Sequence, residues 1–557
     1  MKKLLKYIPA AWTVSLALIM MCHAQPDGRS VSMDSSLLKA DVYFLASGEL
    51  QGRETGLAGA QTAAVFLASR LYALQLKPFF EADKSSILTP YYQTFEMAGA
   101  VPSQVESSLT FHMREISIEA RPQQDYFYFF NSPLPADLKG DVCFVGYGIQ
   151  APEFNYDDLS GRDCKGKIAL AFYGEPQLSG DSLFFNGDHI THYSLPGWKT
   201  ENLAKTGAKA LILIPDPARV DYYDKFLQRQ GRRSGETQFV LQNEKSLPVI
   251  YLSGEFAKKV FGRLYNGGDS PEQKRLQKWA SGKSGNFQWR EDAAKNLQAD
   301  LKIKLPQTEV RKGRNVLAVL PGSDPQLRDE YILGGTHFDH EGIKENRIYF
   351  GADDNASGVA ANLNIARALA GLSKMQQPQR SIIFAFWDAE EKGMLGSRYF
   401  LDHPPVPLSR IKAAFNMDMI GRDASFNFAA LRQPMMDEDA ENKVMIFYSA
   451  QAPQLAAVAR KVNITRPLHL LFDPNAYFTS GSDHAAFHEA KIPVVYYFTG
   501  FHTDYSQPGD TPDKIDFQKL TRIAGHIAAF VKQLADMPEM PDFDNSVISA
   551  PEGDFSR

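Results

Sequence analysis

Residues 331–371 read YILGGTHFDHEGIKENRIYFGADDNASGVAANLNIARALAG. An apolar run at 331–335 is followed by polar residues and then, after Ser357, by apolar residues at helical spacing. Strand-like runs recur on both sides of this stretch, and we expect a further helix after Lys392. These runs are NVLAVL (315–320), SIIFAF (381–386), AAFNM (413–417) and PVVYYF (493–498). Strands that alternate with helices predict an α/β fold with helices on both faces of one sheet.

The rest of the chain falls into segments that differ in their pattern of apolar and polar residues. Residues 35–80 carry a helical period, as in GAQTAAVFLASRLYALQL, and predict an amphipathic helix that ends at Leu76-Lys77-Pro78. From about Gln93 to Gln242, short β-branched and aromatic runs are separated by Gly, Asp and Pro, which predicts a β-rich module. We therefore expect an inserted domain at 111–295. It would separate an N-terminal part (25–110) from a main part (296–536), with a tail at 537–557.

Composition limits the function classes. The 557 residues are 44% hydrophobic and 22% charged, which are values of a globular protein and exclude a largely disordered or multi-span membrane chain. Lys and Arg number 60 against 65 Asp and Glu, for a net charge of −5, and no long basic block is present. We expect no nucleic-acid partner.

The first residues, MKKLLKYIPAAWTVSLALIMMCHAQ, predict a signal peptide at 1–24 and a periplasmic or secreted protein. Lipidation at Cys22 is the alternative, and only then do we expect membrane attachment. The bulky Met20 and Met21 disfavour it. Cys143 and Cys164 are equally consistent with one disulfide or with two buried thiols, and neither has the neighbours of a catalytic cysteine.

Polar residues that bear chemistry cluster where apolar runs stop, and ligands in open α/β sheets bind beyond the carboxyl ends of strands. Each residue alone is more often a helix cap or a packing residue. The argument for a functional site rests on the recurrence of such residues at the ends of successive strands. The segments are THFDH with His337 and Asp339, GADDNASG with Asp353 and Asp354, DAEEKG with Glu390 and Glu391, NMDMIG with Asp418, and GSDHAAF with Asp483 and His484.

Charge indicates how many cations such a site would hold. One divalent ion among the carboxylates of Asp353, Glu391 and Asp418 would keep a net negative charge and make a poor Lewis acid, whereas two ions would leave a positive charge. Asp353 is suited to bridge them. Imidazole and carboxylate ligands without thiolate favour Zn²⁺ over Mn²⁺ or Co²⁺. Glu390 beside the site is a candidate general base for amide hydrolysis.

The ordered pattern H-x-D, G-x-D-D/N-N-x-S-G, E-E-x-G, a strand-ending Asp and S-D-H resembles metallopeptidase family twenty-eight, the two-zinc aminopeptidases. The resemblance covers residues 337–484, and it extends to HTDYSQPGDTPDKID from His502 and to FLASGELQGRETGLAG near the start. It implies a three-layer mixed-sheet zinc peptidase domain. The insert, with GDVCFVGYGI and CKGKIALAFYG, resembles a protease-associated domain.

Position by position, the resemblance implies two zinc ions per chain. His337 and Asp418 would bind one zinc and Glu391 and His484 the other, with Asp353 bridging both. It further implies that Glu390 is the general base, that the carboxylate of Asp339 fixes the tautomer of His337, and that a cis peptide joins residues 353 and 354. The activity implied is removal of N-terminal residues from peptide substrates.

Three alternatives stay open at this stage. A carboxypeptidase of the same family would need a cationic pocket, for which Arg398 or Arg422 is available. Glutaminyl cyclisation resembles a one-zinc version of the site without the first histidine, and His337 argues against it. A non-catalytic scaffold would have lost ligands or base.

Several nearby residues receive lesser roles. We interpret His340, His488 and His502 as surface or packing residues, and we consider Tyr477 and Tyr505 as hydrogen-bond donors to an oxyanion. Oligomeric state is not predicted.

Overall fold

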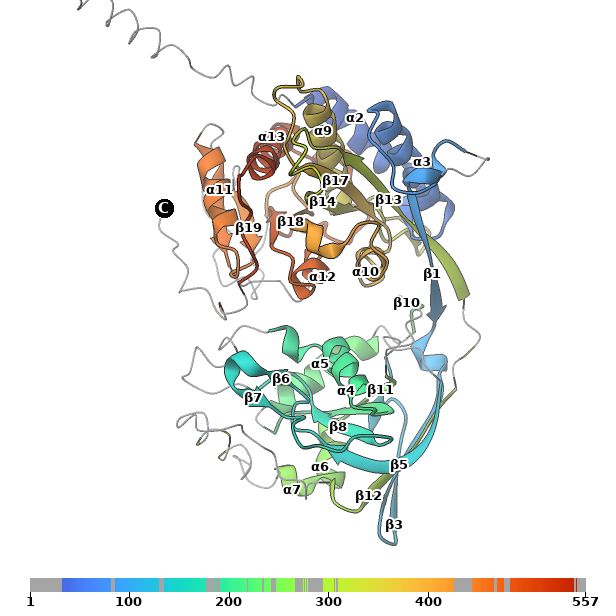
Figure 1. Ribbon diagram of the computed structural model, residues 1–557. Helices are drawn as coiled ribbons and strands as arrows, with labels where there is room; N and C mark the ends of the chain where they lie inside the picture. Colours follow the sequence, from blue (N-terminus) through green and yellow to red (C-terminus); the bar gives the residue numbers. More distant parts are fainter. Residues whose placement is uncertain are drawn as a thin grey trace, which may run out of the picture.

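A computed structural model describes most of the chain and shows two lobes joined by long strands (Figure 1). The residues described are 33–544 and 547, apart from 82–85, 130–134, 177–184, 186–190, 218, 233–234, 242–246, 266–273, 275, 277, 279–293, 305, 307–308, 425–442, 465–467 and 475–480. The predicted signal peptide, Cys22 and Tyr477 lie outside them. Among the helices of the described residues, none has the length and apolar character needed to cross a bilayer.

The first lobe is built on one nine-stranded mixed sheet. Its strands, in spatial order, are β10 (Gln238–Leu241), β1 (Tyr92–Ala100), β13 (Glu309–Leu320), β17 (Ser381–Trp387), β14 (Tyr331–His337), β18 (Ile411–Met417), β21 (Val494–Phe498), β19 (Lys443–Tyr448) and β20 (His469–Asp473). The four neighbours β17, β14, β18 and β21 are parallel. Their carboxyl ends therefore meet at one edge of the sheet.

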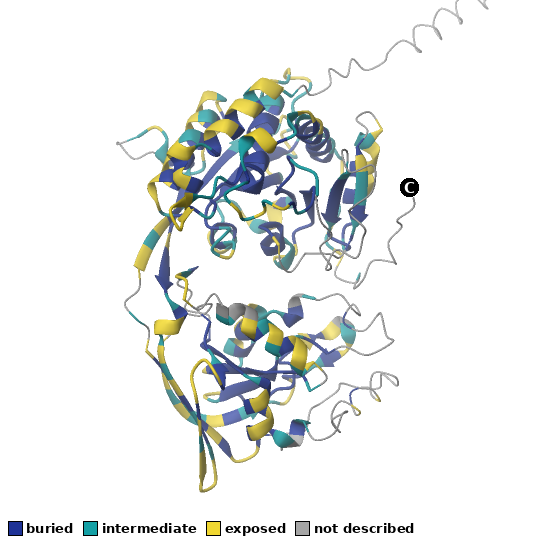
Figure 2. Ribbon diagram, turned by 180° about the vertical axis from the view of Figure 1, so that it is seen from behind, coloured by how far each residue is buried: buried dark blue, intermediate teal, exposed yellow. Residues whose placement is uncertain are grey.

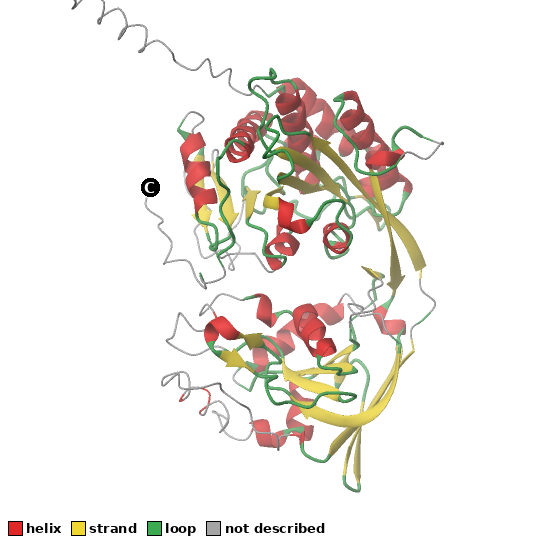
Figure 3. Ribbon diagram, viewed as in Figure 1, coloured by secondary structure: helices red, strands yellow, loops and turns green. Residues whose placement is uncertain are grey.

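Helices cover both faces of this sheet, as the alternation predicts (Figure 3). In β17, Ile382, Phe384 and Phe386 face one hydrophobic core, while Ile383, Ala385 and Trp387 face another. The first core also holds residues of α2 (Ser35–Leu45), α3 (Ala58–Ala73), α9 (Gly358–Ala370), α11 (Gln454–Asn463) and α13 (Phe517–Ala535). The second holds residues of α10 (Leu395–Asp402) and α12 (His484–Glu489). The lobe is a three-layer α/β structure, and its central strand β17 is buried on both sides (Figure 2).

The second lobe contains an eight-stranded sheet. Its strands, in spatial order, are β3 (Ile116–Ala120), β2 (Glu106–Met113), β12 (Leu297–Lys304), β5 (Ala136–Phe144), β8 (Ile168–Phe172), β9 (Ala210–Ile214), β11 (Val249–Leu252) and β4 (Tyr126–Phe127). Its helices include α4 (Pro196–Lys205), α5 (Val220–Arg232), α6 (Gly254–Val260) and α7 (Gly262–Tyr265). These strands run from residue 106 to residue 304, so the second lobe is wider than the predicted insert at 111–295.

Two details differ from the sequence-based expectation. β10 lies within the predicted insert, yet it pairs with β1 of the nine-stranded sheet through Met97 and Leu241. The helical region at 35–80 is divided into α2 and α3. Gln51, Gly52 and Arg53 between them have φ of 51°, 71° and 51°, which interrupts the right-handed helix. The strands expected from 315–320, 331–335, 381–386, 413–417 and 493–498 are all present.

Candidate metal centre

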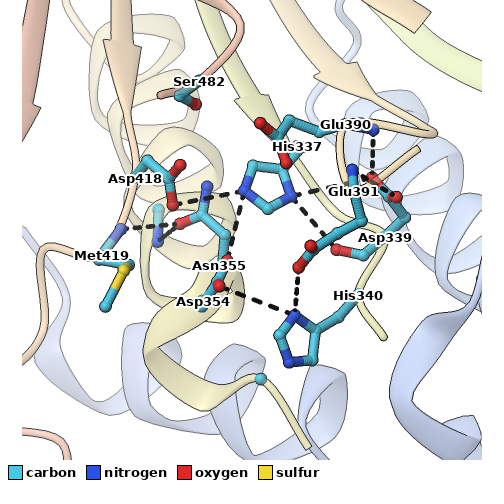
Figure 4. Close-up of polar contacts among 12 residues, drawn as sticks. His337, Asp339, His340, Asp354, Asn355, Glu390, Glu391, Asp418, Met419 and Ser482 are labelled. Carbon is cyan, nitrogen blue, oxygen red and sulfur yellow. Dashed lines mark hydrogen bonds and ion pairs between the residues drawn. The ribbon is translucent and has the colours of Figure 1, made fainter. Parts of the chain in front are cut away.

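The parallel strands bring most of the predicted residues together. His337 is the last residue of β14, Asp418 directly follows β18, and Glu390 and Glu391 follow β17 after two intervening residues. Since β14 lies between β17 and β18, these side chains meet at the carboxyl ends of the central strands of the sheet. Figure 4 shows the ring of His337 between Asp418 on one side and Asp339 on the other.

One group of ligand atoms comprises His337, Asp354 and Asp418. The Nε2 atom of His337 lies 3.3 Å from Oδ1 of Asp418 and 3.5 Å from Oδ1 of Asp354. Two ligand atoms on a tetrahedral zinc, each about 2.0–2.1 Å from the metal, are about 3.3 Å apart. The spacing of this group therefore suits a shared cation.

A second group comprises His340, Asp354 and Glu391. Nδ1 of His340 lies 2.7 Å from Oε1 of Glu391 and 3.9 Å from Oδ2 of Asp354. The shorter distance is that of a hydrogen bond rather than of two ligands on one ion. Asp354 presents one oxygen to each group, so its carboxylate lies between them.

Asp353, the predicted bridging residue, belongs to neither group of clustered ligand atoms among the described residues. Oδ1 of Asp353 accepts a hydrogen bond of 2.7 Å from the main-chain N–H of Gly421, and its main-chain carbonyl accepts from Ser357. Asp353 thus ties the turn at 352–357 to the loop after β18. The cis peptide joins Asp354 and Asn355, so its predicted place between residues 353 and 354 is wrong by one position.

His484 also differs from the expectation. It is the first residue of α12 and is buried, but among the described residues it belongs to neither group of clustered ligand atoms. Its ring stacks on Tyr496 with centroids 4.2 Å apart. Asp483 beside it accepts a hydrogen bond of 2.6 Å from Ser397. Both residues of the S-D-H motif therefore contact groups other than the two clusters.

The carboxylate of Asp339, predicted to orient His337, contacts the segment of Glu390 and Glu391 more closely. The Asp339 carboxylate accepts hydrogen bonds from the main-chain N–H groups of Glu390 (2.9 Å) and Glu391 (3.3 Å), and from the Thr55 hydroxyl (3.0 Å). Nδ1 of His337 is closer to the main-chain carbonyl of Asp339, at 3.2 Å, than to its carboxylate, at 3.8 Å. That carbonyl thus fixes the proton of His337 on Nδ1 and leaves Nε2 facing the first group.

Two histidines interpreted as packing residues lie at the site. His340 is fully buried in the second group. The ring of His502 is buried, with Nε2 3.3 Å from Oδ2 of Asp353 and 4.0 Å from Oδ1 of Asp510. Asp510 accepts hydrogen bonds from the main-chain N–H groups of Asp353 and Asp354. The sequence signal for His340 was its closeness to the H-x-D motif, whereas His502 begins a segment that the resemblance covers.

The site concentrates negative charge. Burial raises the pKa of Glu390 well above its ordinary value, and the neighbouring Glu391 raises it further. Burial would lower the pKa of His337, but Asp418 and Glu390 raise it well above its usual range. Burial would raise the pKa of Glu391, yet its contacts with His340 lower it to about 2. An electrostatic field of this sign favours bound cations.

The donor set fits metal ions in a second way. Several buried polar atoms of these residues have no hydrogen-bond partner within the described ranges, which is costly unless a ligand satisfies them. They are Nε2 of His337, Nε2 of His340, Oδ1 of Asp418 and both ring nitrogens of His502. Imidazole nitrogen and carboxylate oxygen are the ligands of zinc sites.

A small cavity opens beside the two groups. One wall is acidic and the other is mainly aromatic. The acidic residues are Asp354, Glu390, Glu391 and Asp418, and the others include Met419, Tyr496, Phe498, Phe501 and Tyr505. The cavity therefore offers negative charge next to an apolar surface.

Buried imidazoles and carboxylates at the carboxyl edge of a mixed sheet define an α/β protein with a candidate metal centre. Residues 315–531 match the model of peptidase family M28.

Curated relatives carry two kinds of name. A glutamate carboxypeptidase 2 homolog from Caenorhabditis elegans is 25% identical over 465 residues, covering 72% of this chain and 55% of the relative. Leupeptin-inactivating enzyme 1 from Streptomyces exfoliatus is 31% identical over 201 residues, covering 35% and 37%. The chain thus spans little more than half of the first relative and less of the second.

Among solved structures, an aminopeptidase from Aneurinibacillus sp. strain AM-1 aligns with a TM-score of 0.45 and 19% identity. The alignment covers 93% of this chain and 98% of that one.

Proposed function

We propose that the protein is a dinuclear zinc aminopeptidase that removes N-terminal residues from peptides. One observation carries this proposal: the two carboxylate oxygens of Asp354 face two different groups of candidate ligands. A shared carboxylate is what a pair of neighbouring cations requires.

His337, Asp418 and Asp354 would hold one zinc, and Asp354 and Glu391 would hold the other. An imidazole would complete the second set. His340 is close enough but already hydrogen bonded to Glu391, whereas His502 is buried and has neither ring nitrogen bonded to a described residue. Metal content of His340→Ala and His502→Ala separates them, because only removal of the ligand should lose one ion per chain.

Zinc, when bound, supplies a Lewis acid that polarises a carbonyl and activates water. Glu390 borders the same cavity and is proposed to take the proton of the attacking water and return it to the leaving amine. Asp339 holds the main-chain N–H groups of Glu390 and Glu391, and so sets the direction of both side chains.

An amino terminus is proposed as the bound end of the substrate because the cations that a carboxypeptidase would need are engaged elsewhere. Both arginines considered for a carboxypeptidase are paired: Arg398 with Glu489 at 3.0 Å and Arg422 with Asp504 at 2.9 Å. The carboxypeptidase alternative keeps support from the name of the nematode relative.

The remaining parts of the proposal concern the setting of the site. The second lobe is proposed to be a protease-associated domain that restricts substrate entry, and Figure 1 shows that α4 and α5 lie on its side toward the first lobe. Export to the periplasm or beyond rests on the charge and apolar pattern of residues 1–24. Peptides are the proposed substrates.

A paired assay tests this function. The zinc-loaded protein is given peptides with a free N-terminus and the same peptides N-acetylated, with and without a C-terminal amide. We expect cleavage of free peptides to be at least a hundredfold faster than that of acetylated ones, and indifferent to amidation. Activity that survives acetylation and is lost on amidation would establish the carboxypeptidase instead.

A further inference from the structure

Arg53 lies in the segment between α2 and α3, nearly 300 residues before the candidate metal centre in sequence, yet it contacts residues next to two of the candidate ligands. Its side chain is fully buried. Nε donates to the carbonyl of Phe338 (2.7 Å), Nη1 to those of Leu45 and Phe350 (2.9 Å for the latter), and Nη2 to that of Gly351 (2.9 Å). Every hydrogen bond of this guanidinium to a described residue ends on a main-chain carbonyl.

Three of these carbonyls flank candidate ligands. Phe338 stands between His337 and Asp339, and Phe350 and Gly351 directly precede the turn that carries Asp354. One rigid group therefore binds two of the three segments that supply the first set of ligands, those of His337 and Asp354. The guanidinium has five N–H donors in a fixed planar arrangement, whereas a lysine ammonium has three donors on a flexible chain.

Main-chain hydrogen bonds reinforce the same connection. The N–H of His340 donates to the carbonyl of Arg53 (3.1 Å), and the N–H of Gly342 donates to that of Gly52 (3.1 Å). A Cβ on Gly52 would lie 2.5 Å from the carbonyl oxygens of both Gly342 and Tyr349. This backbone therefore approaches the ligand loops so closely that only glycine fits.

The charge of Arg53 has a further consequence. Burial lowers its pKa to about 10, while Asp354 and then Asp339 oppose that change, so the side chain stays protonated at neutral pH. A permanent cation then offsets part of the repulsion among the carboxylates before any metal binds. The ligand loops would hold their spacing in the metal-free protein.

We propose that Arg53 is a positioning residue that fixes the two ligand loops relative to each other and so sets the metal affinity of the site. This inference rests on the proposed zinc site. It gives the GELQGRETG segment, which supplies no candidate ligand, the role of holding the ligand loops in place.

The test compares Arg53→Met and Arg53→Lys with wild type and with a control, Arg70→Met. Arg70 is an arginine of α3 whose side chain is 43% exposed and pairs with Asp41 at 3.5 Å. Zinc affinity of the full chain is measured by competition with a chelating dye. We expect Arg53→Met to weaken zinc binding by about 10–100-fold, the usual effect of losing support behind a ligand, with Arg53→Lys intermediate and Arg70→Met unchanged.

Hydrogen exchange of the metal-free proteins gives an independent readout. We expect residues 337–342 and 350–355 to lose protection in Arg53→Met while α13 keeps it. Wild-type affinity together with wild-type protection in Arg53→Met would overturn the inference. If that variant does not fold, Arg53→Lys decides by the same two measurements. A wild-type protein that binds no zinc would refute the proposed function, whereas the exchange comparison would still test the positioning role.

Discussion

Both lobes bury charged residues near parallel strands, but the two lobes differ in whether these residues have hydrogen-bond partners. In the second lobe, Lys199 is buried and donates to the carbonyl of Tyr147, while Asp158 accepts two main-chain N–H groups and Glu175 accepts from Thr191. In the first lobe, Nε2 of His337, Nε2 of His340 and both ring nitrogens of His502 have no hydrogen-bond partner among the described residues. Buried charge that is neutralised within the protein serves stability, and buried donors without partners indicate a ligand.

The largest effect is expected at Glu390. Glu390→Gln should lower kcat by about a thousandfold, because the water loses its proton acceptor, while both metals stay bound. Turnover of a free-amine peptide and metal content are measured on the same sample. Near wild-type turnover would remove Glu390 from the mechanism.

A buried charge of the second lobe should give the opposite result. Lys199→Met leaves Asp158 and Glu175 without their cation and should lower the free energy of unfolding by about 4 kcal/mol. Metal content and kcat/KM should not change at a temperature where the variant is folded. Urea denaturation measures the stability. Loss of zinc in this variant would mean that the two lobes are not separable in function.

The cysteine pair of the second lobe is a further point of comparison. The Sγ atoms of Cys143 and Cys164 are 2.9 Å apart, and both are free thiols in the structure. Exchange with oxidised glutathione would form the disulfide and release two reduced glutathiones. Closing this loop should stabilise the protein by about 3 kcal/mol. Thermal melting before and after oxidation tests it, and Cys164→Ser should show no such shift.

The smallest expected effect is at the aromatic wall of the cavity. Phe501→Ala should lower kcat/KM for peptides with an apolar first residue by about tenfold, through lost apolar contact, with metal content unchanged. Peptides that begin with glycine should be affected much less. An equal loss for both would show that Phe501 supports the site rather than contacting the substrate side chain.

Sequence predicted the parts of the site that regular structure places. His337, Glu391 and Asp418 follow apolar runs, and neighbouring parallel strands necessarily bring such residues to one edge. The choice between Asp353 and Asp354 could not be made in this way. Adjacent identical carboxylates point in different directions, and the direction depends on the local backbone, which at Asp354 has φ of −104° and ψ of 91°.

The positions of residues on connecting loops could not be predicted from the periodic sequence pattern. His340 and His502 reach the site through loops whose paths depend on tertiary contacts, including the main-chain bonds to residues 52 and 53. His484 follows a motif, but the start of α12 directs its ring against Tyr496. The segment around Arg53 was noted in the sequence as part of the resemblance, yet only the structure shows what its guanidinium binds.

The central claim is that Asp354 is shared by two cations. Metal content per chain of wild type, Asp354→Ala and Asp353→Ala tests it most directly. The account predicts two zinc ions in wild type and in Asp353→Ala, and fewer than one in Asp354→Ala. Two ions retained in Asp354→Ala, or their loss in Asp353→Ala alone, would contradict it.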